Sequence, residues 1–193
     1  MIEKITEIVH QSLDVKCRFF AAHTADVGRV ARTIAESLKA GGRIYLFGNG
    51  GSASDAQHIA AEFINRFSFD HPPIPALALT TDTSVLTSIS NDSAFLHVFS
   101  RQIAAFGRRG DVAVGISTSG SSPNVIEGIK QAKQLRMTTV GLLGKDGGQL
   151  AALVDHALIV PSNSTARVQE VHIMIGHIIC ELVEHELYGS IQP

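Results

Sequence analysis

Apolar residues at the start of the chain recur at the spacing of a helix. They form two series: Ile2, Ile5, Val9 and Leu13, then Val27, Val30, Ile34 and Leu38. An apolar residue every three or four positions places these side chains on one helical face. The pattern predicts two helices with no strand between them, a helical arm over residues 1–40 that packs on another subunit.

Beyond Gly42 the apolar residues come in short runs bounded by turn residues. Five runs predict strands: 43–47, 75–79, 111–116, 138–143 and 156–160. Helical stretches separate these runs, as in a parallel sheet covered by helices on both faces. The last stretch, 168–187, is apolar on most sides and predicts a long, largely buried helix. We therefore expect one α/β domain over 1–193, with a five-stranded parallel sheet flanked by helices in 41–193.

Composition and charge exclude several classes of protein. The chain has 193 residues and 45% hydrophobic content, enough for one domain with a well-filled core. A net charge of −2 leaves no basic surface for nucleic acid or an anionic membrane. The N-terminus mixes acids and bases without the apolar segment of a signal peptide. We expect a soluble, cytoplasmic protein with no nucleic-acid or membrane partner, in which Cys17 and Cys180 are reduced core residues.

Two loops that follow predicted strands are rich in glycine and hydroxyl residues. One is GNGGSASD (48–55), and the other is STSGSSPN (117–124), with Pro123 near the start of the next helix. Open parallel sheets bind ligands beyond the carboxyl ends of their strands. Hydroxyl groups, glycine N–H groups and a helix N-terminus together form an anion site. Neither loop fits the Walker A or G-x-G-x-x-G pattern. Each alone is an ordinary capped turn, whereas two at strand ends favour a phosphate site.

Polar residues interrupt the apolar faces of two predicted helices. His58 and Glu62 are four residues apart and share one helical face. Most isolated pairs of this kind belong to a surface stripe, but Glu62 sits among alanines and a phenylalanine. On the last helix, Gln169 and His177 are roughly 80° apart. Spacing alone favours Glu170 equally well as the partner of His177. His172 is expected to be a core or interface histidine.

Several segments together resemble the sugar-isomerase (SIS) domain proteins, and among them the phosphoheptose isomerases. The similarity covers nearly the whole chain and is carried by residues 48–63, 86–92, 110–126, 141–148 and 166–187. The STSG turn is common to all SIS domains. The combination of His58, Glu62, Gln169 and His177 is far more specific.

The resemblance implies a set of site residues and a metal. It assigns one zinc ion per subunit to His58, Glu62, Gln169 and His177, with Glu62 and His177 as the catalytic pair. Substrate contacts are implied for Asn49, Gly50, Gly51, Ser52, Glu62, Asn91, Asp92, Ser117, Thr118, Ser119, Ser122 and Gln169. The chain departs from some members at 53–54, where they carry His-Cys, and at Ala166, where they carry an aspartate. A homotetramer with sites near subunit interfaces is also implied.

The activity implied is a zinc-assisted isomerisation through an enediol. It interconverts D-sedoheptulose 7-phosphate and D-glycero-D-manno-heptose 7-phosphate, the first step toward ADP-heptose and the heptose of the lipopolysaccharide core. One alternative is an isomerase of a pentose or hexose phosphate. The other is a non-catalytic SIS tetramer that binds the bacterial replication initiator DnaA, a role that does not require Glu62 and His177. Because both residues are present, we expect the enzyme.

Overall fold

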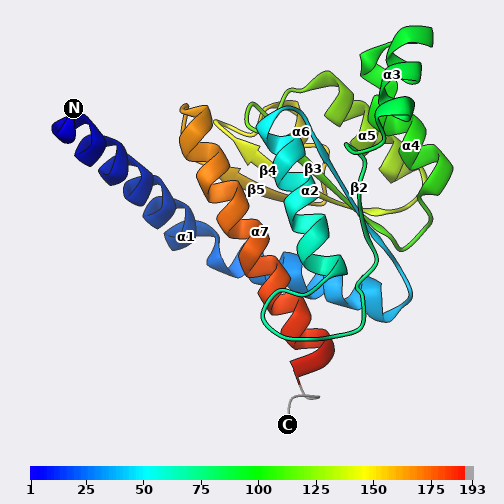
Figure 1. The fold of residues 1–193 in the computed structure, drawn as a ribbon, viewed down its shortest axis with the longest axis horizontal. Coiled ribbons are helices and arrows are strands. Elements are labelled where there is room, and N and C mark those ends of the chain that lie inside the picture. The colour runs from blue at the N-terminus through cyan, green and yellow to red at the C-terminus, as the bar shows by residue number, and fades with distance from the viewer. Residues whose placement is uncertain (190–193) are drawn as a thin grey trace.

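The computed structural model describes residues 1–189, and strands and helices alternate in it after a long first helix (Figure 1). The elements in order are α1 (Ile2–Lys39), β1 (Ile44–Gly48), α2 (Gly51–Ile64), β2 (Ala76–Ala78), α3 (Thr83–Asp92), the 3-10 helix η1 (Phe95–His97), α4 (Val98–Phe106), β3 (Val112–Ser117), α5 (Pro123–Gln134), β4 (Thr138–Gly144), α6 (Gly148–Ala151), β5 (His156–Val160) and α7 (Thr165–Tyr188).

The five strands form one parallel sheet in the order β2-β1-β3-β4-β5, which confirms the predicted fold class. The chain leaves β1, forms β2 on one side, and returns to β3 on the other side of β1. The order of strands therefore reverses between β1 and β3, where Gly48 pairs with Ile116. Loops that leave the carboxyl ends of two such strands diverge, which is where α/β sheets bind ligands.

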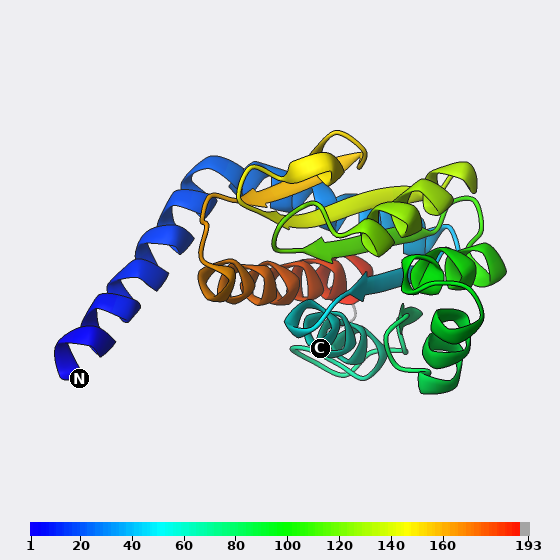
Figure 2. The same ribbon diagram turned by 90° about the horizontal axis from the view of Figure 1, so that it is seen from above.

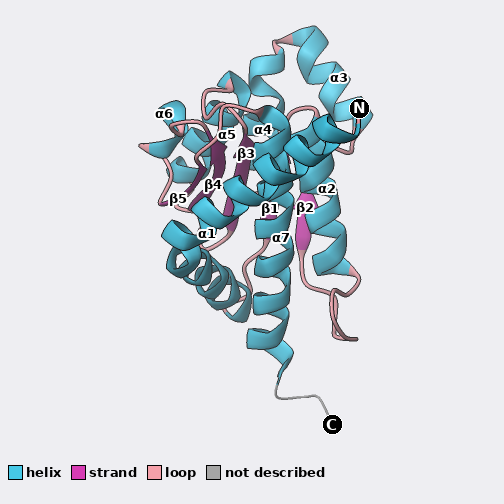
Figure 3. Cartoon of the chain, turned by 90° about the vertical axis from the view of Figure 1, so that its left-hand side faces the viewer, coloured by secondary structure: helices cyan, strands magenta, loops and turns pink. Residues whose placement is uncertain are grey.

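Helices cover both faces of the sheet, and each strand divides its side chains between two cores (Figure 2, Figure 3). Ile44 and Leu46 of β1 pack with α1, α2 and α7, whereas Tyr45 and Phe47 pack with α4, α5 and α6. Successive side chains of a strand point to opposite faces, so an apolar strand fills both layers. This three-layer arrangement presents the carboxyl ends of the strands at one edge.

The first helix is continuous, and the prediction of two helices was wrong. Residues 14–26 contain no glycine or proline, and Val15 and Phe19 carry the apolar face from one series to the next. The N-terminal half of α1 extends away from the sheet (Figure 1, Figure 2). Exposed apolar side chains line it: Ile2, Ile5, Ile8, Val9 and Leu13.

Two of the three expected core residues outside the site are buried. His172 is fully buried on α7, and its Nε2–H donates to the carbonyl oxygen of Leu143 at 3.0 Å. Cys180 is buried too, and burial raises the pKa of its thiol. Cys17 is exposed, so its placement in the core was wrong: Val15 and Phe19 take the buried face of α1, and Cys17 falls outside it.

No helix among residues 1–189 combines the length and the apolar character needed to cross a lipid bilayer.

Candidate functional site

The two glycine-rich loops meet at the point where the strand order reverses. The side-chain amide of Asn49, after β1, donates to Oδ1 of Asn124, and the amide of Asn124 donates back to Oδ1 of Asn49, both at 2.8 Å. Asn124 is buried in the first turn of α5. The reciprocal pair holds the first loop against the start of α5. It also occupies the Asn49 side chain, for which a sugar contact was expected.

The loop after β3 gathers three hydroxyl groups. Oγ of Ser117 lies 2.9 Å from Oγ of Ser122 and 3.4 Å from Oγ of Ser119. Ser119 also accepts a hydrogen bond from the backbone N–H of Ser121 at 3.2 Å. Thr118 lies half-buried between these serines. Because the hydroxyl groups converge where a helix begins, the turn suits a phosphate.

The start of α5 faces the same turn. Ser122 is the residue that precedes the helix, and Pro123 occupies its first turn. Within the described part of the chain, no side chain caps this helix, so its first N–H groups remain donors for an anion. Gly120 has a φ of +65°, and a Cβ there would lie 2.0 Å from the carbonyl oxygen of Gly147. Only glycine therefore lets the turn pack on the following loop.

The loop after β1 is shaped by glycines and contacts α7. Gly50 has a φ of +55°, and Ser52 is buried in the first turn of α2. A Cβ on Gly51 would lie 2.2 Å from Nε2 of Gln169, so the Gln169 side chain packs directly on this backbone. A hollow of about 120 Å³ adjoins the loop and is lined by Gly48, Asn49, Gly50, Ala53, Thr80, Leu86, Phe95 and Phe99.

Three of the four predicted metal ligands form a contact cluster between α2 and α7. Nε2 of His58 lies 3.1 Å from Oε1 of Glu62 and 3.4 Å from Nε2 of His177. The rings of His58 and His177 meet edge-on, with centroids 5.0 Å apart. The His58 side chain is 48% exposed and that of Glu62 is 27% exposed, so the cluster remains open to a ligand.

The structure distinguishes Gln169 from Glu170. Spacing along α7 had left the two equally suitable as partners of His177. Glu170 accepts a hydrogen bond from Oγ of Ser12 at 2.6 Å and forms an ion pair with Arg167 at 2.6 Å. Glu170 therefore faces α1. Gln169 instead faces the first loop at Gly51. Gln169 thus lies on the side of α7 that the candidate site uses.

Among the described residues, Asn91 and Asp92 hydrogen-bond to each other and not to the His58–Glu62–His177 cluster. Both are exposed at the end of α3, where the Asn91 amide donates to Oδ1 of Asp92 at 2.8 Å. In Figure 1, α3 lies well away from α7. A substrate contact through this pair remains a prediction.

Asp55 is a residue of this region that the sequence analysis missed. Its Oδ2 is buried and has no hydrogen-bond partner among the described residues. Burial raises the pKa of this carboxyl group to about 6, although nearby His58 opposes the shift. A signal was present in the sequence, because Asp55 precedes His58 by three residues and so shares its side of α2.

The donor types of the cluster fit a zinc ion. Zinc in proteins is held by imidazole nitrogen and carboxylate oxygen, and two ligand atoms of a tetrahedral site lie about 3.3 Å apart. The two contacts of His58 Nε2 are close to that spacing. Over residues 1–189, however, no three His, Cys, Asp or Glu side chains are already arranged around one point as metal ligands. The residues fit zinc by chemistry, and their rotamers must adjust to bind it.

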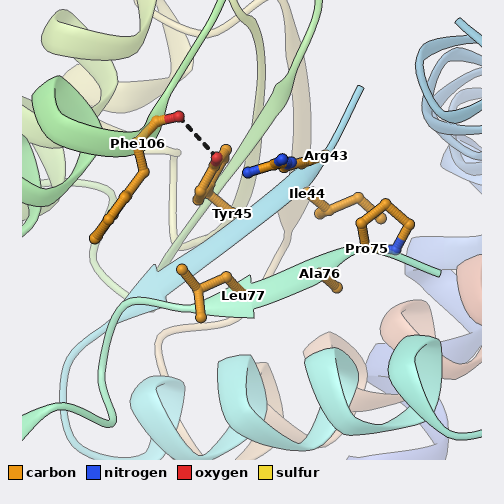
Figure 4. A pocket seen from close by; sticks show the side chains of 7 residues that line it. All are labelled: Arg43, Ile44, Tyr45, Pro75, Ala76, Leu77 and Phe106. Atoms are coloured by element: carbon orange, nitrogen blue, oxygen red, sulfur yellow. Dashed lines mark hydrogen bonds between the residues drawn. The ribbon is translucent and has the colours of Figure 1, made fainter. Parts of the chain in front are cut away.

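A larger hollow lies at the opposite end of β1 (Figure 4). Its volume is about 320 Å³, and its lining residues are Arg43, Ile44, Tyr45, Pro75, Ala76, Leu77 and Phe106. The hydroxyl group of Tyr45 donates to the carbonyl oxygen of Phe106 at 3.0 Å. This hollow adjoins the amino ends of β1 and β2. It is therefore remote from both glycine-rich loops and lacks their convergent polar groups.

Comparison with known proteins agrees with this arrangement. The model of the SIS domain family matches residues 9–144. The chain is 50% identical over 187 residues to the phosphoheptose isomerase of Solidesulfovibrio magneticus, covering 97% of this chain and 91% of the relative.

Two solved structures share the fold over nearly their whole length. The phosphoheptose isomerase from Neisseria gonorrhoeae has a TM-score of 0.89 and 43% identity, covering 94% of this chain and 97% of the other. The phosphoheptose isomerase from Francisella tularensis has a TM-score of 0.92 and 33% identity, with 95% and 98% covered. On its sequence and on its fold, the chain belongs to the SIS domain family, within the group of the phosphoheptose isomerases.

Proposed function

We propose that the protein is a sugar-phosphate isomerase that interconverts D-sedoheptulose 7-phosphate and D-glycero-D-manno-heptose 7-phosphate. The observation that carries the proposal is the joint presence of a serine turn suited to phosphate and the His58–Glu62–His177 cluster. The names of the relatives support the choice of a heptose phosphate. The product would enter heptose synthesis for the lipopolysaccharide core in the bacterial cytoplasm.

The first loop contacts the start of α5 through Asn49 and Asn124, and the cluster lies farther along α2. His58 follows Gly51 by seven residues, about 10 Å along the helix axis. In a heptose 7-phosphate, the phosphate and the reacting carbons C1 and C2 lie at opposite ends of the chain. Anchoring the phosphate in the serine turn would set the register of C1 and C2 at the cluster.

Glu62 and His177 divide the proton transfers of this proposal. Ketose–aldose isomerisation moves a proton between C1 and C2 through an enediol, and protons also move on O1 and O2. Glu62 is the base that removes the carbon-bound proton, because its carboxylate lies in the open cluster, 3.1 Å from Nε2 of His58. The imidazole of His177 exchanges protons with the sugar oxygens, since one ring nitrogen can donate while the other accepts.

His58, Glu62, Gln169 and His177 would hold one zinc ion in each subunit. A bound zinc ion supplies Lewis-acid stabilisation of negative charge on the sugar oxygens. Four protein ligands make a closed, structural site. A catalytic role therefore requires that Glu62 or Gln169 loosens when substrate binds. Gln169 is suited to this, since its amide already packs on the Gly51 backbone of the first loop.

We also propose a homotetramer assembled through α1. Five apolar side chains on the projecting part of this helix are between 39% and 80% exposed. Continuous apolar surface of this kind marks a protein interface. Helix packing between copies would cover it and bring subunits together near the candidate sites, in a closed symmetric assembly.

The test is turnover of a panel of ketose phosphates with five, six and seven carbons, followed by NMR in deuterium oxide. We expect heptose phosphate to be turned over best and its C1 or C2 hydrogen to exchange with solvent. Preference for a pentose or hexose phosphate would assign a different substrate to the same chemistry. Complete absence of turnover and exchange would contradict the proposal and favour the non-catalytic, initiator-binding role.

A further inference from the structure

The segment between α2 and β2, residues 65–75, has no regular secondary structure, yet a buried carboxylate of α7 holds it. Oε1 of Glu184 accepts the backbone N–H of Phe67 at 2.8 Å, and Oε2 accepts that of Ser68 at 2.8 Å. Burial alone would raise the pKa of Glu184, but these amides, that of Phe69 and nearby His71 hold it below the usual range. The carboxylate is thus ionised, and both of its oxygens accept hydrogen bonds from the segment.

His71 closes this anchor from the other side. Its Nε2 lies 3.0 Å from Oε1 of Glu184, and both side chains are 1% exposed. Its Nδ1 lies 2.8 Å from the carbonyl oxygen of Pro72. An ionised carboxylate can only accept, so Nε2–H of His71 donates to Glu184. The ring also stacks on Tyr188 at 5.2 Å with an interplanar angle of 8°.

The anchored segment reaches the candidate site through Phe67. Its ring lies against the imidazole of His177, with centroids 5.4 Å apart and an interplanar angle of 38°. Glu184 follows His177 by seven residues, so the two share one face of α7. Glu184 therefore binds the backbone N–H of Phe67, and the ring of Phe67 contacts His177.

The His177 ring contacts two aromatic neighbours. One is Phe67, and the other is His58, with Nε2 of the two imidazoles 3.4 Å apart. An imidazole on a helix surface otherwise rotates about χ1 and χ2. Packing by Phe67 removes that freedom and keeps Nε2 of His177 directed at His58.

We propose that Glu184 and His71 are positioning residues: their buried hydrogen-bonded contact fixes Phe67, and Phe67 fixes the His177 imidazole for proton transfer. The inference rests on the proposed function for its kinetic consequence. The orientation of His177 itself is independent of any activity.

The experiment compares Glu184→Gln with Glu186→Gln on the same helix. Glu186 is exposed and pairs with Lys39, so its replacement matches the chemical change without touching the segment. Phe67→Leu removes the ring current of Phe67 and defines the NMR signals of an uncovered His177 ring, which is assigned with His177→Gln. His71→Gln removes the imidazole from the contact while leaving the carboxylate and its amide contacts, and it decides the question if Glu184→Gln does not fold.

We expect Glu184→Gln and His71→Gln to shift the His177 ring signals toward those of Phe67→Leu. Their kcat should fall about tenfold or more, because displacing a reacting group slows the chemical step. Their KM should stay within about twofold of the wild-type value. Glu186→Gln should match the wild type.

Three outcomes would overturn the inference: unchanged His177 signals, shifted signals with wild-type kcat, or lower stability with both readouts intact. If the wild type turns over no sugar phosphate, the proposed function fails, while the NMR comparison still decides whether the Glu184–His71 contact positions His177.

Discussion

Gly176 of α7 lies directly against Ile59 of α2: a Cβ on Gly176 would be 2.5 Å from Cδ1 and 2.7 Å from Cγ1 of Ile59. These residues adjoin His177 and His58 in the chain. The absence of a side chain at Gly176 therefore lets the two helices approach closely enough for the imidazoles to meet.

Gly176→Ala should separate the helices at the candidate site. Overpacking costs about 1–3 kcal/mol, more than the gain of up to about 1 kcal/mol from alanine in a helix. We expect a lower free energy of unfolding in urea and reduced turnover. Ile59→Val removes Cδ1 and should restore part of both in the double variant. A single variant as stable and active as the wild type would show that Gly176 does not set the spacing.

Glu62→Gln and His177→Gln should each abolish most of the turnover. Glutamine retains a ligand oxygen or nitrogen in both cases but cannot take up a proton. Loss of a general acid or base typically costs 10²–10⁴ in rate, so kcat should fall by about that factor while sugar phosphate still binds. The measurements are steady-state kinetics and exchange of the C1 or C2 hydrogen.

His58→Ala is the matched comparison, because it removes a proposed ligand without removing a proposed proton-transfer group. Added zinc should restore part of its activity, and metal analysis should find less bound zinc after dialysis. Exchange at the wild-type rate in Glu62→Gln would reduce Glu62 to a ligand and refute its role as the base.

Ser119→Asp should mainly weaken substrate binding. It places negative charge among the hydroxyl groups proposed to bind phosphate, so KM should rise by at least about tenfold, with a much smaller change in kcat. Gln134→Glu adds the same charge at the far, exposed end of α5 and serves as the control. An unchanged KM in Ser119→Asp would place the phosphate elsewhere.

The exposed apolar face of α1 predicts the assembly. Light scattering at micromolar concentration should give a mass of four times 20.6 kDa. Val9→Glu puts a charge into the proposed interface and should lower the mass, whereas Glu3→Gln, an exposed polar residue of the same helix, should not. A monomeric wild type would refute the tetramer.

Acid should destabilise the protein through His172. Burial lowers the pKa of this imidazole from 6.5 to about 4, so the unfolded chain binds the proton first as the pH falls. The contribution of neutral His172 to the free energy of unfolding is complete above pH 6.5 and is lost as the pH falls toward 4. It amounts to about 3 kcal/mol in all, of which about 2 kcal/mol is lost by pH 5. The free energy of unfolding in urea should differ less between pH 7 and pH 5 in His172→Gln than in the wild type. Glutamine keeps a hydrogen-bond donor for the carbonyl oxygen of Leu143 but does not titrate.

Much of the fold was predictable because its central strands are buried on both faces. The run 111–116 has no polar residue after Asp111, and no amphipathic helix has that pattern. The first helix was mispredicted because its middle, residues 14–26, buries only an occasional side chain such as Val15 or Phe19. A weak periodic signal there concealed the continuity of α1.

The candidate site was predictable where it depends on local sequence. Both glycine-rich loops and the His58–Glu62 spacing lie within single strand–loop–helix units. Helical spacing alone could not decide between Gln169 and Glu170, because Ser12 of α1, far away in sequence, turns Glu170 aside. Asp55 was missed for a related reason: its buried oxygen is a property of the packed fold.

The amide pair of Asn49 and Asn124 restricts which sequences can occupy both positions. Each side chain gives one proton and takes one, so aspartate at either place would set two acceptors against each other. A change at one position therefore demands a matching change at the other, 75 residues away. Libraries that vary the two positions together should recover folded variants that single replacements miss.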